Sequence, residues 1–89
     1  GLVHLLDLRD EQLEIIEVEI GEHSPAAGRT VGEMNLPEGS LIISLLRDGK
    51  GFVPKADTEI RSGDEMLLVL DPGLEDAIMV ELAAPSAGD

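Results

Sequence analysis

The chain has 89 residues, enough for one compact domain and too few for a second hydrophobic core. Its formal net charge is −13 at pH 7, from 19 acidic and 6 basic residues, and no stretch gathers the basic ones. This charge argues against nucleic acid and against the anionic surface of a membrane as direct partners. With no cysteine, the chain has no disulfide, no thiol nucleophile and no cysteine-ligated zinc.

Apolar residues make up 43% of the chain, and Phe52 is its one aromatic residue, so the core must be built from aliphatic side chains. A chain of this length buries only about 60–65% of its unfolded surface, so it gains from apolar area that a partner can cover. The sequence contains no run of 18 apolar residues, and we expect no signal peptide. We therefore expect a cytoplasmic protein without direct membrane insertion.

The first ten residues carry an apolar patch that either pairs as a strand or leads in from an upstream domain. The abrupt start favours an excised fragment, and we interpret residues 1–11 as a connection from that domain. Residues 13–20 alternate with period 2, which predicts a strand with Ile16, Val18 and Ile20 on one face. The first half of this strand is apolar on both faces and should be covered.

A short helix is predicted over residues 31–34. Thr30 provides an N-cap hydroxyl, and Glu33 stands three residues later in capping-box spacing. Pro37 and Gly39 are expected to end the helix.

A hairpin is predicted next. Residues 41–46 form an apolar run typical of a strand buried on both faces. Asp48 and Gly49 favour a type I′ turn, in which both central residues need positive φ. A return strand through residues 51–53 should end at Pro54.

A further strand, apolar on both faces, is predicted over residues 65–70. Asp71 as N-cap and Pro72 at the first helical position then predict a helix over residues 73–82, and the tail 83–89 should be disordered. The helix residues expected to reach the core are Leu74, Ala77, Ile78 and Leu82.

Strands that are apolar on both faces need two layers of cover, whereas the chain offers one short and one longer helix. A second copy related by a two-fold axis can cover the remaining face. The alternative is a five-stranded sheet curled into a barrel. We predict an α+β fold with a small, mostly antiparallel sheet, a short helix after the first strand and a C-terminal helix, forming a dimer.

No catalytic chemistry is evident, so we predict that the domain is not an enzyme and binds no metal. His4 and His23 lack partners at diagnostic spacing and should be solvated. No nucleophile elbow, phosphate loop, dinucleotide fingerprint or calcium loop is present. Glu17 and Glu19 could form half of a cation site across a dimer axis, but a solvated face is favoured. Lys50 lacks the sequence context of a lipoylated hairpin lysine.

Beyond these generic features, the order of the segments resembles one family. An acidic strand (EVEI) is followed by SPAAGRTVGEMNLPEG, LIISLLRDG, FVP and DTEIRSGDEMLLV. No single piece is specific, but together they resemble the TrkA-C (RCK-C) domain, which we place at residues 12–82.

The resemblance implies a homodimeric regulatory domain that follows a Rossmann-type domain. It implies control of a potassium channel or transporter from the cytoplasmic side of the membrane, through a membrane partner subunit. NAD or ATP would then bind only to the upstream domain. The alternative is a structural dimerisation domain of an anion symporter or exchanger, without a ligand.

Some members of the family bind cyclic di-AMP between two such domains. The matching positions are Val31, Met34, Asn35, Leu36, Ile42, Ile43 and Pro54. Glu33 and Glu38 oppose this reading, because they add negative charge where phosphates would bind, and Arg29 and Arg47 are the nearby cations. These apolar residues are therefore interpreted first as a dimer core and second as a ligand cleft.

Overall fold

The computed structural model describes residues 2–8 and 12–83. In chain order the elements are β1 (Leu2–Leu8), β2 (Leu13–Glu19), the 3-10 turn η1 (Val31–Glu33), β3 (Ser40–Arg47), β4 (Lys50–Phe52), β5 (Glu65–Leu70) and α1 (Glu75–Leu82). The five strands form one sheet in the order β1-β2-β5-β3-β4, and every neighbouring pair is antiparallel. The predicted antiparallel sheet with a C-terminal helix is confirmed.

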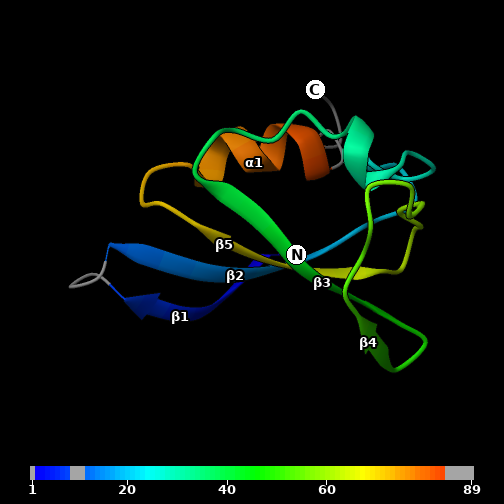
Figure 1. The fold of residues 1–89 in the computed structure, drawn as a ribbon, viewed down its shortest axis with the longest axis horizontal. Helices are drawn as coiled ribbons and strands as arrows, with labels where there is room; N and C mark the ends of the chain where they lie inside the picture. Colours follow the sequence, from blue (N-terminus) through cyan, green and yellow to red (C-terminus); the bar gives the residue numbers. More distant parts are fainter. Residues whose placement is uncertain (1, 9–11, 84–89) are drawn as a thin grey trace.

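One face of the sheet is covered. Figure 1 shows α1 and the connection that contains η1 on the same side of the strands. Six strand side chains on this face are fully buried, as are Ile78 and Leu82 of α1. The buried strand residues of this core are Ile16, Val18, Leu45, Met66, Leu68 and Leu70. The predicted apolar face of residues 13–20 is therefore the face that packs under the helix.

The opposite face is not covered by any described part of the chain. The strand register places Leu6, Ile15, Val69 and Leu41 side by side across four strands. Leu41 is 63% exposed and Leu6 is 46% exposed. We call this row, with the neighbouring Val3, Leu46 and Leu67, the open face. The prediction that residues 41–46 are buried on both faces is therefore wrong for a single chain.

The sheet is open, so the barrel alternative is wrong for the described residues. β1 and β4 form its two edges. The first residues of the chain pair as a strand with β2, which was one of the two interpretations of that segment. The tail, residues 84–89, lies outside the described part, as do residue 1 and residues 9–11. The single α-helix of the described residues is too short to cross a membrane.

The predicted hairpin is confirmed. Arg47 pairs with Lys50, which leaves a two-residue turn between β3 and β4. Asp48 has φ 51° and Gly49 has φ 80°, as a type I′ turn requires.

Where the sequence predicts a short helix, the chain makes one turn of 3-10 helix over Val31–Glu33. Gly32 is a poor helix former, and Pro37 disfavours helical geometry in the residue before it. Met34 is already extended, with ψ 136°. The predicted contact between Thr30 and Glu33 is present. The Glu33 carboxylate accepts hydrogen bonds from the Thr30 N–H and hydroxyl, both at 2.8 Å.

The C-terminal helix begins later than predicted. Its N-cap is Leu74 and not Asp71. Gly73 has φ +90°, which no right-handed helix contains, so the chain turns there before α1 begins. The resulting phase leaves Ala77 exposed, and Met79 packs against the core in its place.

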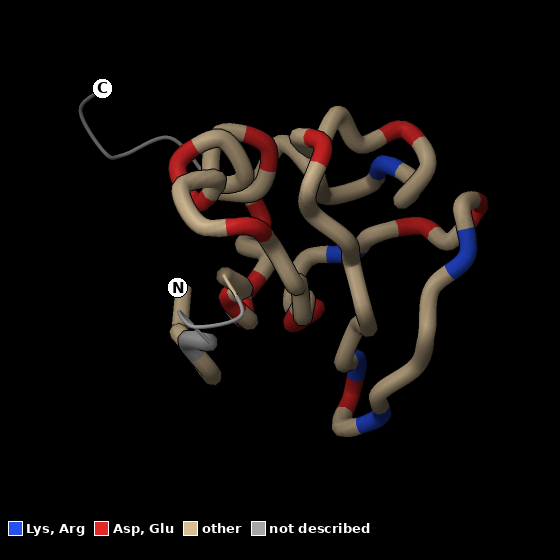
Figure 2. Tube along the Cα trace, turned by 60° about the vertical axis from the view of Figure 1, so that its left-hand side comes forward, with Lys and Arg blue, Asp and Glu red and all other residues tan. Residues whose placement is uncertain are grey.

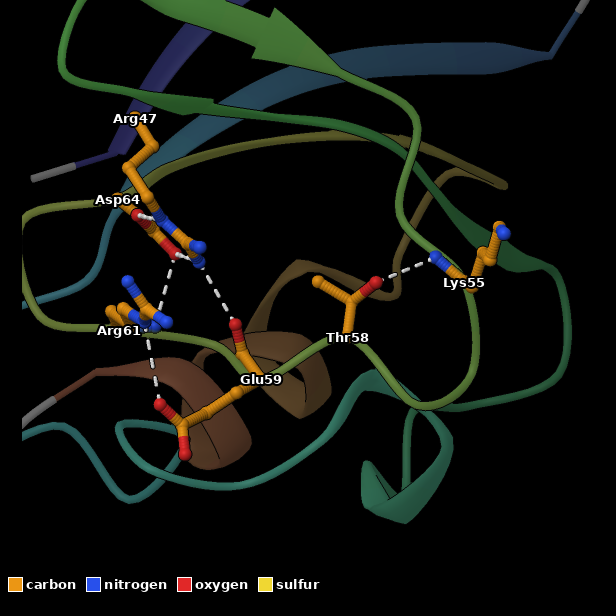
Figure 3. A network of polar contacts seen from close by, with 6 residues as sticks. All are labelled: Arg47, Lys55, Thr58, Glu59, Arg61 and Asp64. Atoms are coloured by element: carbon orange, nitrogen blue, oxygen red, sulfur yellow. Dashed lines mark hydrogen bonds and ion pairs between the residues drawn. The ribbon is translucent and has the colours of Figure 1, made fainter.

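A buried ion pair ties the hairpin to the loop before β5 (Figure 3). The Asp64 side chain is 1% exposed and accepts hydrogen bonds from Arg47 Nε at 2.8 Å and Nη2 at 2.7 Å. It also accepts one from the Arg61 N–H at 2.9 Å. Arg47 Nη2 donates to the Glu59 carbonyl at 2.8 Å. The carboxylate thus has three donors, as a buried charge requires.

Burial alone would raise the pKa of Asp64, but the hydrogen bonds from Arg47 and from the Arg61 N–H outweigh it and lower this pKa below its ordinary value of 3.8. The folded chain therefore holds this proton more weakly than the unfolded chain does. The stability that Asp64 contributes is complete above the unfolded pKa and is lost as pH falls through the lowered folded value.

Replacing Asp64 with Asn should lower the free energy of unfolding by about 2–3 kcal/mol at pH 7, because Arg47 loses its buried partner. The difference from the wild type should shrink as pH is lowered below about 4, since the unfolded wild-type chain then binds a proton that the folded carboxylate resists, and the wild type loses stability. Urea unfolding at pH 7 and at pH 3 measures both effects. Asp57→Asn, at an exposed position, is the control. Equal stability of the wild type and Asp64→Asn at pH 7 would contradict a structural role for this pair.

Candidate functional site

A pocket of about 320 Å³ lies between the η1 turn, the start of β3 and the loop after β4. Its walls are mostly apolar. The lining residues are Val31, Gly32, Met34, Leu36, Ser40, Leu41, Ile42, Pro54, Lys55 and Ala56.

Backbone hydrogen bonds hold the two walls of the pocket together. The Gly32 N–H donates to the Ala56 carbonyl at 2.8 Å, and the Val31 N–H donates to the Thr58 carbonyl at 2.9 Å. A Cβ at Gly32 would stand 3.0 Å from the Ala56 oxygen, so the close approach of the walls favours glycine here. The Thr58 hydroxyl accepts a hydrogen bond from the Lys55 N–H at 2.9 Å, which fixes the loop (Figure 3).

The pocket borders an unpaired strand edge. β4 pairs only with the last residues of β3, from Leu45 to Arg47. On that side, Ser40 to Ser44 face no strand among the described residues. A free edge exposes backbone donors and acceptors that another chain could use.

The structure brings together five of the seven residues predicted for a cleft. They are Val31, Met34, Leu36, Ile42 and Pro54. Asn35 and Ile43 do not line the pocket, and Ile43 lies at an irregularity in the pairing of β3 with β5. A bulge shifts the alternation of side chains and cannot be recognised from the apolar run itself.

The cation of the pocket is Lys55, which the sequence reasoning missed. Arg29 and Arg47 were the expected cations, but both are engaged elsewhere. Arg29 donates to the Glu33 carbonyl and lies 3.7 Å from a Glu81 oxygen, whereas Arg47 is bound to Asp64. The order Phe-Val-Pro-Lys after the hairpin could have indicated Lys55, because Pro54 was already assigned to the cleft.

The two glutamates that opposed anion binding do not line the pocket. The Glu33 carboxylate turns back onto Thr30, and hydrogen bonds from the Thr30 N–H and hydroxyl lower the pKa of Glu33. Figure 2 shows α1 with acidic but no basic positions, whereas the described Lys and Arg residues lie on β3, on β4, in the connection before η1 and in the segment between β4 and β5. The lining itself contains one lysine and no carboxylate.

The pocket offers groups for binding more than for catalysis. Ser40 donates its hydroxyl proton to the Pro37 carbonyl at 2.6 Å, and no histidine or carboxylate lies among the lining residues to activate it. What remains is an aliphatic wall, one ammonium group and a free strand edge. Such a surface can hold an apolar, flat or anionic group.

The two histidines differ in their surroundings. The His23 side chain is 81% exposed and lies beside its neighbour Glu22, in line with the predicted solvated residue. His4 has distant partners instead, because its Nε2 lies 2.9 Å from an oxygen of Glu75 and 3.5 Å from one of Glu14. A spacing of 71 residues between His4 and Glu75 gives no sequence signal.

Comparison with known proteins identifies relatives of this domain. The TrkA-C domain family matches residues 15–82. The chain is 32% identical over 68 residues to the Trk system potassium uptake protein TrkA of Mycobacterium tuberculosis, across 76% of this chain and 31% of that protein. It is 30% identical over 69 residues to a TrkA homolog of Archaeoglobus fulgidus, across 78% of this chain and 16% of that protein. The chain thus spans less than a third of the length of these relatives.

Solved structures share the fold. The GsuK RCK domain superposes with a TM-score of 0.80 at 25% identity, over 97% of this chain and 19% of that one. The RCK_C domain dimer of S. agalactiae BusR, in complex with c-di-AMP, superposes with a TM-score of 0.62 at 25% identity, over 73% of this chain and 90% of that one. The family match includes β3, β4, β5, α1 and the whole pocket, and the chain belongs to the TrkA-C domain family.

Proposed function

We propose that this domain is a regulatory module, not an enzyme, in which two copies pair and take up cyclic di-AMP in the pocket beside β3. The observation that carries the proposal is the pocket itself. It is lined by five of the seven predicted cleft residues, lies at a free strand edge and contains a lysine.

The choice of ligand is supported by the likeness to the BusR RCK_C dimer, which was solved with c-di-AMP. The ligand carries two phosphates and two purine bases. Lys55 would pair with a phosphate, and the aliphatic walls at Met34, Leu36 and Ile42 would pack against a base. One copy offers one ammonium group, so two copies would supply one for each phosphate.

The pairing of two copies is supported by two surfaces of β3 that no described residue covers. Its first residues have a free edge beside the pocket, and Leu41 also lies on the open face. A second copy placed there would cover exposed aliphatic area and close the pocket. The ligand would then shift the arrangement of the dimer by its difference in affinity for two arrangements, which is the only energetic source of such a switch.

In the whole protein, the domain would serve potassium transport, as in the Trk system proteins that it resembles. We place it in the cytoplasm, at the inner face of the membrane through a channel or transporter subunit. An upstream Rossmann-type domain would bind NAD or ATP and receive the motion of the dimer.

A second function is supported by the scarcity of cations at the pocket. The lining contains one cation, Lys55, and no aromatic side chain on which a base could stack. The pocket would therefore bind a dinucleotide weakly. The domain would then be a structural dimerisation module without a ligand, in a potassium system or in an anion symporter or exchanger. Its interface would stay closed under all conditions.

Cyclic di-AMP should raise the melting temperature of the wild-type chain, because it binds only the folded state. Replacing Lys55 with Ala should weaken binding about 10- to 100-fold, as expected for one charge-assisted hydrogen bond. Titration calorimetry measures the loss. Lys50→Ala is the matched control, since Lys50 is also exposed but lies on the hairpin, outside the pocket. No thermal shift at large ligand excess would reject this ligand and favour the structural function.

Replacing Leu41 with Glu should weaken the dimer at least about tenfold, because it places a charge in a desolvated contact. Leu41 suits this test better than Ile42, which packs against the core and would unfold the chain if charged. Val80→Glu is the control, because Val80 is 74% exposed on α1, on the other side of the sheet. Light scattering after gel filtration, over a range of concentrations, gives both dissociation constants. Equal effects of the two substitutions would place the interface elsewhere.

A further inference from the structure

A second cluster of side chains lies away from the pocket, where β1, β2 and α1 meet. It consists of His4, Glu14 and Glu75, one from each element. The His4 Nε2 is 2.9 Å from an oxygen of Glu75 and 3.5 Å from one of Glu14, and all three candidate ligand atoms lie within 4.8 Å of one another. These residues are 10 and 61 positions apart in sequence, so the fold alone brings them together.

The position of Glu14 is unusual. It lies two residues before Ile16, on the face of β2 that is buried under α1, and its side chain is 17% exposed. The other members of this row, Ile16, Val18 and Ile20, are fully buried and apolar. A carboxylate at the end of such a row loses solvation and needs a partner of opposite charge. Glu75, 33% exposed, brings a second negative charge to the same place.

His4 is directed toward this cluster by the strand that carries it. It pairs with Ile16, so it shares the covered face with Glu14, and the register of β1 shifts between His4 and Leu6. This bulge turns Leu6 back to the open face beside Ile15. Bulges commonly re-aim side chains next to functional sites. The His4 side chain remains 48% exposed, which leaves a path for an ion to enter.

The geometry points to a binding site for a divalent transition-metal ion of the zinc class, with His4 Nε2, Glu14 and Glu75 as ligands and water in the remaining position. Zinc takes imidazole nitrogen and carboxylate oxygen at about 2.0–2.2 Å. At that bond length, two ligands of a tetrahedral ion are about 3.4 Å apart. The two distances from His4 Nε2, 2.9 Å and 3.5 Å, lie on either side of this value, and no two of the three ligand atoms are more than 4.8 Å apart. Small side-chain rotations would therefore complete the site.

The charges and donor atoms favour a metal over a proton. A protonated His4 would neutralise one of the two carboxylates, whereas a divalent ion bound to neutral imidazole neutralises both. Calcium and magnesium prefer sites made of oxygen alone, with six or more ligands, and one imidazole with two carboxylates does not match them. The metal would fasten the edge strand β1 to the first turn of α1.

The test uses the 89-residue chain after removal of metals with a chelator. Zn²⁺ is titrated by calorimetry, and the melting temperature is followed with Zn²⁺, Mg²⁺ or Ca²⁺ at the same concentration. Co²⁺ is then added as a spectroscopic probe, because its visible absorption reports the ligand geometry. The variants are Glu75→Gln, which removes one charge at an accessible helix position, and Glu14→Gln. His23→Ala is the matched control, because His23 is the other histidine of the chain.

We expect one Zn²⁺ per chain, a rise in melting temperature of several degrees and no comparable rise with Mg²⁺ or Ca²⁺. Loss of a partner outside the first layer of ligands commonly weakens metal affinity about 10- to 100-fold, so Glu75→Gln should weaken Zn²⁺ binding at least about tenfold. His23→Ala should leave it unchanged. The site would be refuted if Zn²⁺ fails to stabilise the chain, if Glu75→Gln and Glu14→Gln bind it as the wild type does, or if His23→Ala abolishes binding. The cluster would then be an ion pair of His4 with two glutamates.

Discussion

The structure depends on a sheet that is covered on one side only. One eight-residue helix and the connection around η1 cover the face that carries Ile16, Val18 and Met66, and these three side chains are buried. The same strands place aliphatic side chains on the other face, where Leu41 and Leu6 stay substantially exposed. Among the described residues, no further element covers that face. We propose that a second copy buries the open face and so removes this area from water.

This constraint also explains where the pocket lies. β3 extends beyond β4, so its first half has a free edge, and the η1 turn and the loop after β4 form the walls beside it. Leu41 belongs both to the lining of the pocket and to the open face. A ligand in the pocket and a partner on the open face would therefore act on the same strand. The Arg47–Asp64 pair at the far end of β3 holds the hairpin against the loop before β5, which keeps this strand in place.

Local patterns could be read from the sequence, whereas contacts between distant segments could not. Residues 65–70 and the Asp48-Gly49 turn were predicted as the structure has them, because strand alternation and positive φ depend on neighbouring residues. The start of α1 was missed because Asp-Pro is a strong helix start and the left-handed Gly73 has no clear signal. Five cleft residues were found from the resemblance, but Lys55 was missed. His4 comes close to Glu75 only once β1 has paired with β2 and α1 lies over the sheet.

The central claim is that the open face is buried by a second copy of this chain. Sedimentation equilibrium of the wild-type chain over a wide range of concentrations tests it most directly. The account predicts a particle of twice the 9.5 kDa chain mass that dissociates only on dilution. A particle of 9.5 kDa at the highest concentration would show that water covers the open face, and it would contradict both the dimer and the ligand site placed between two copies.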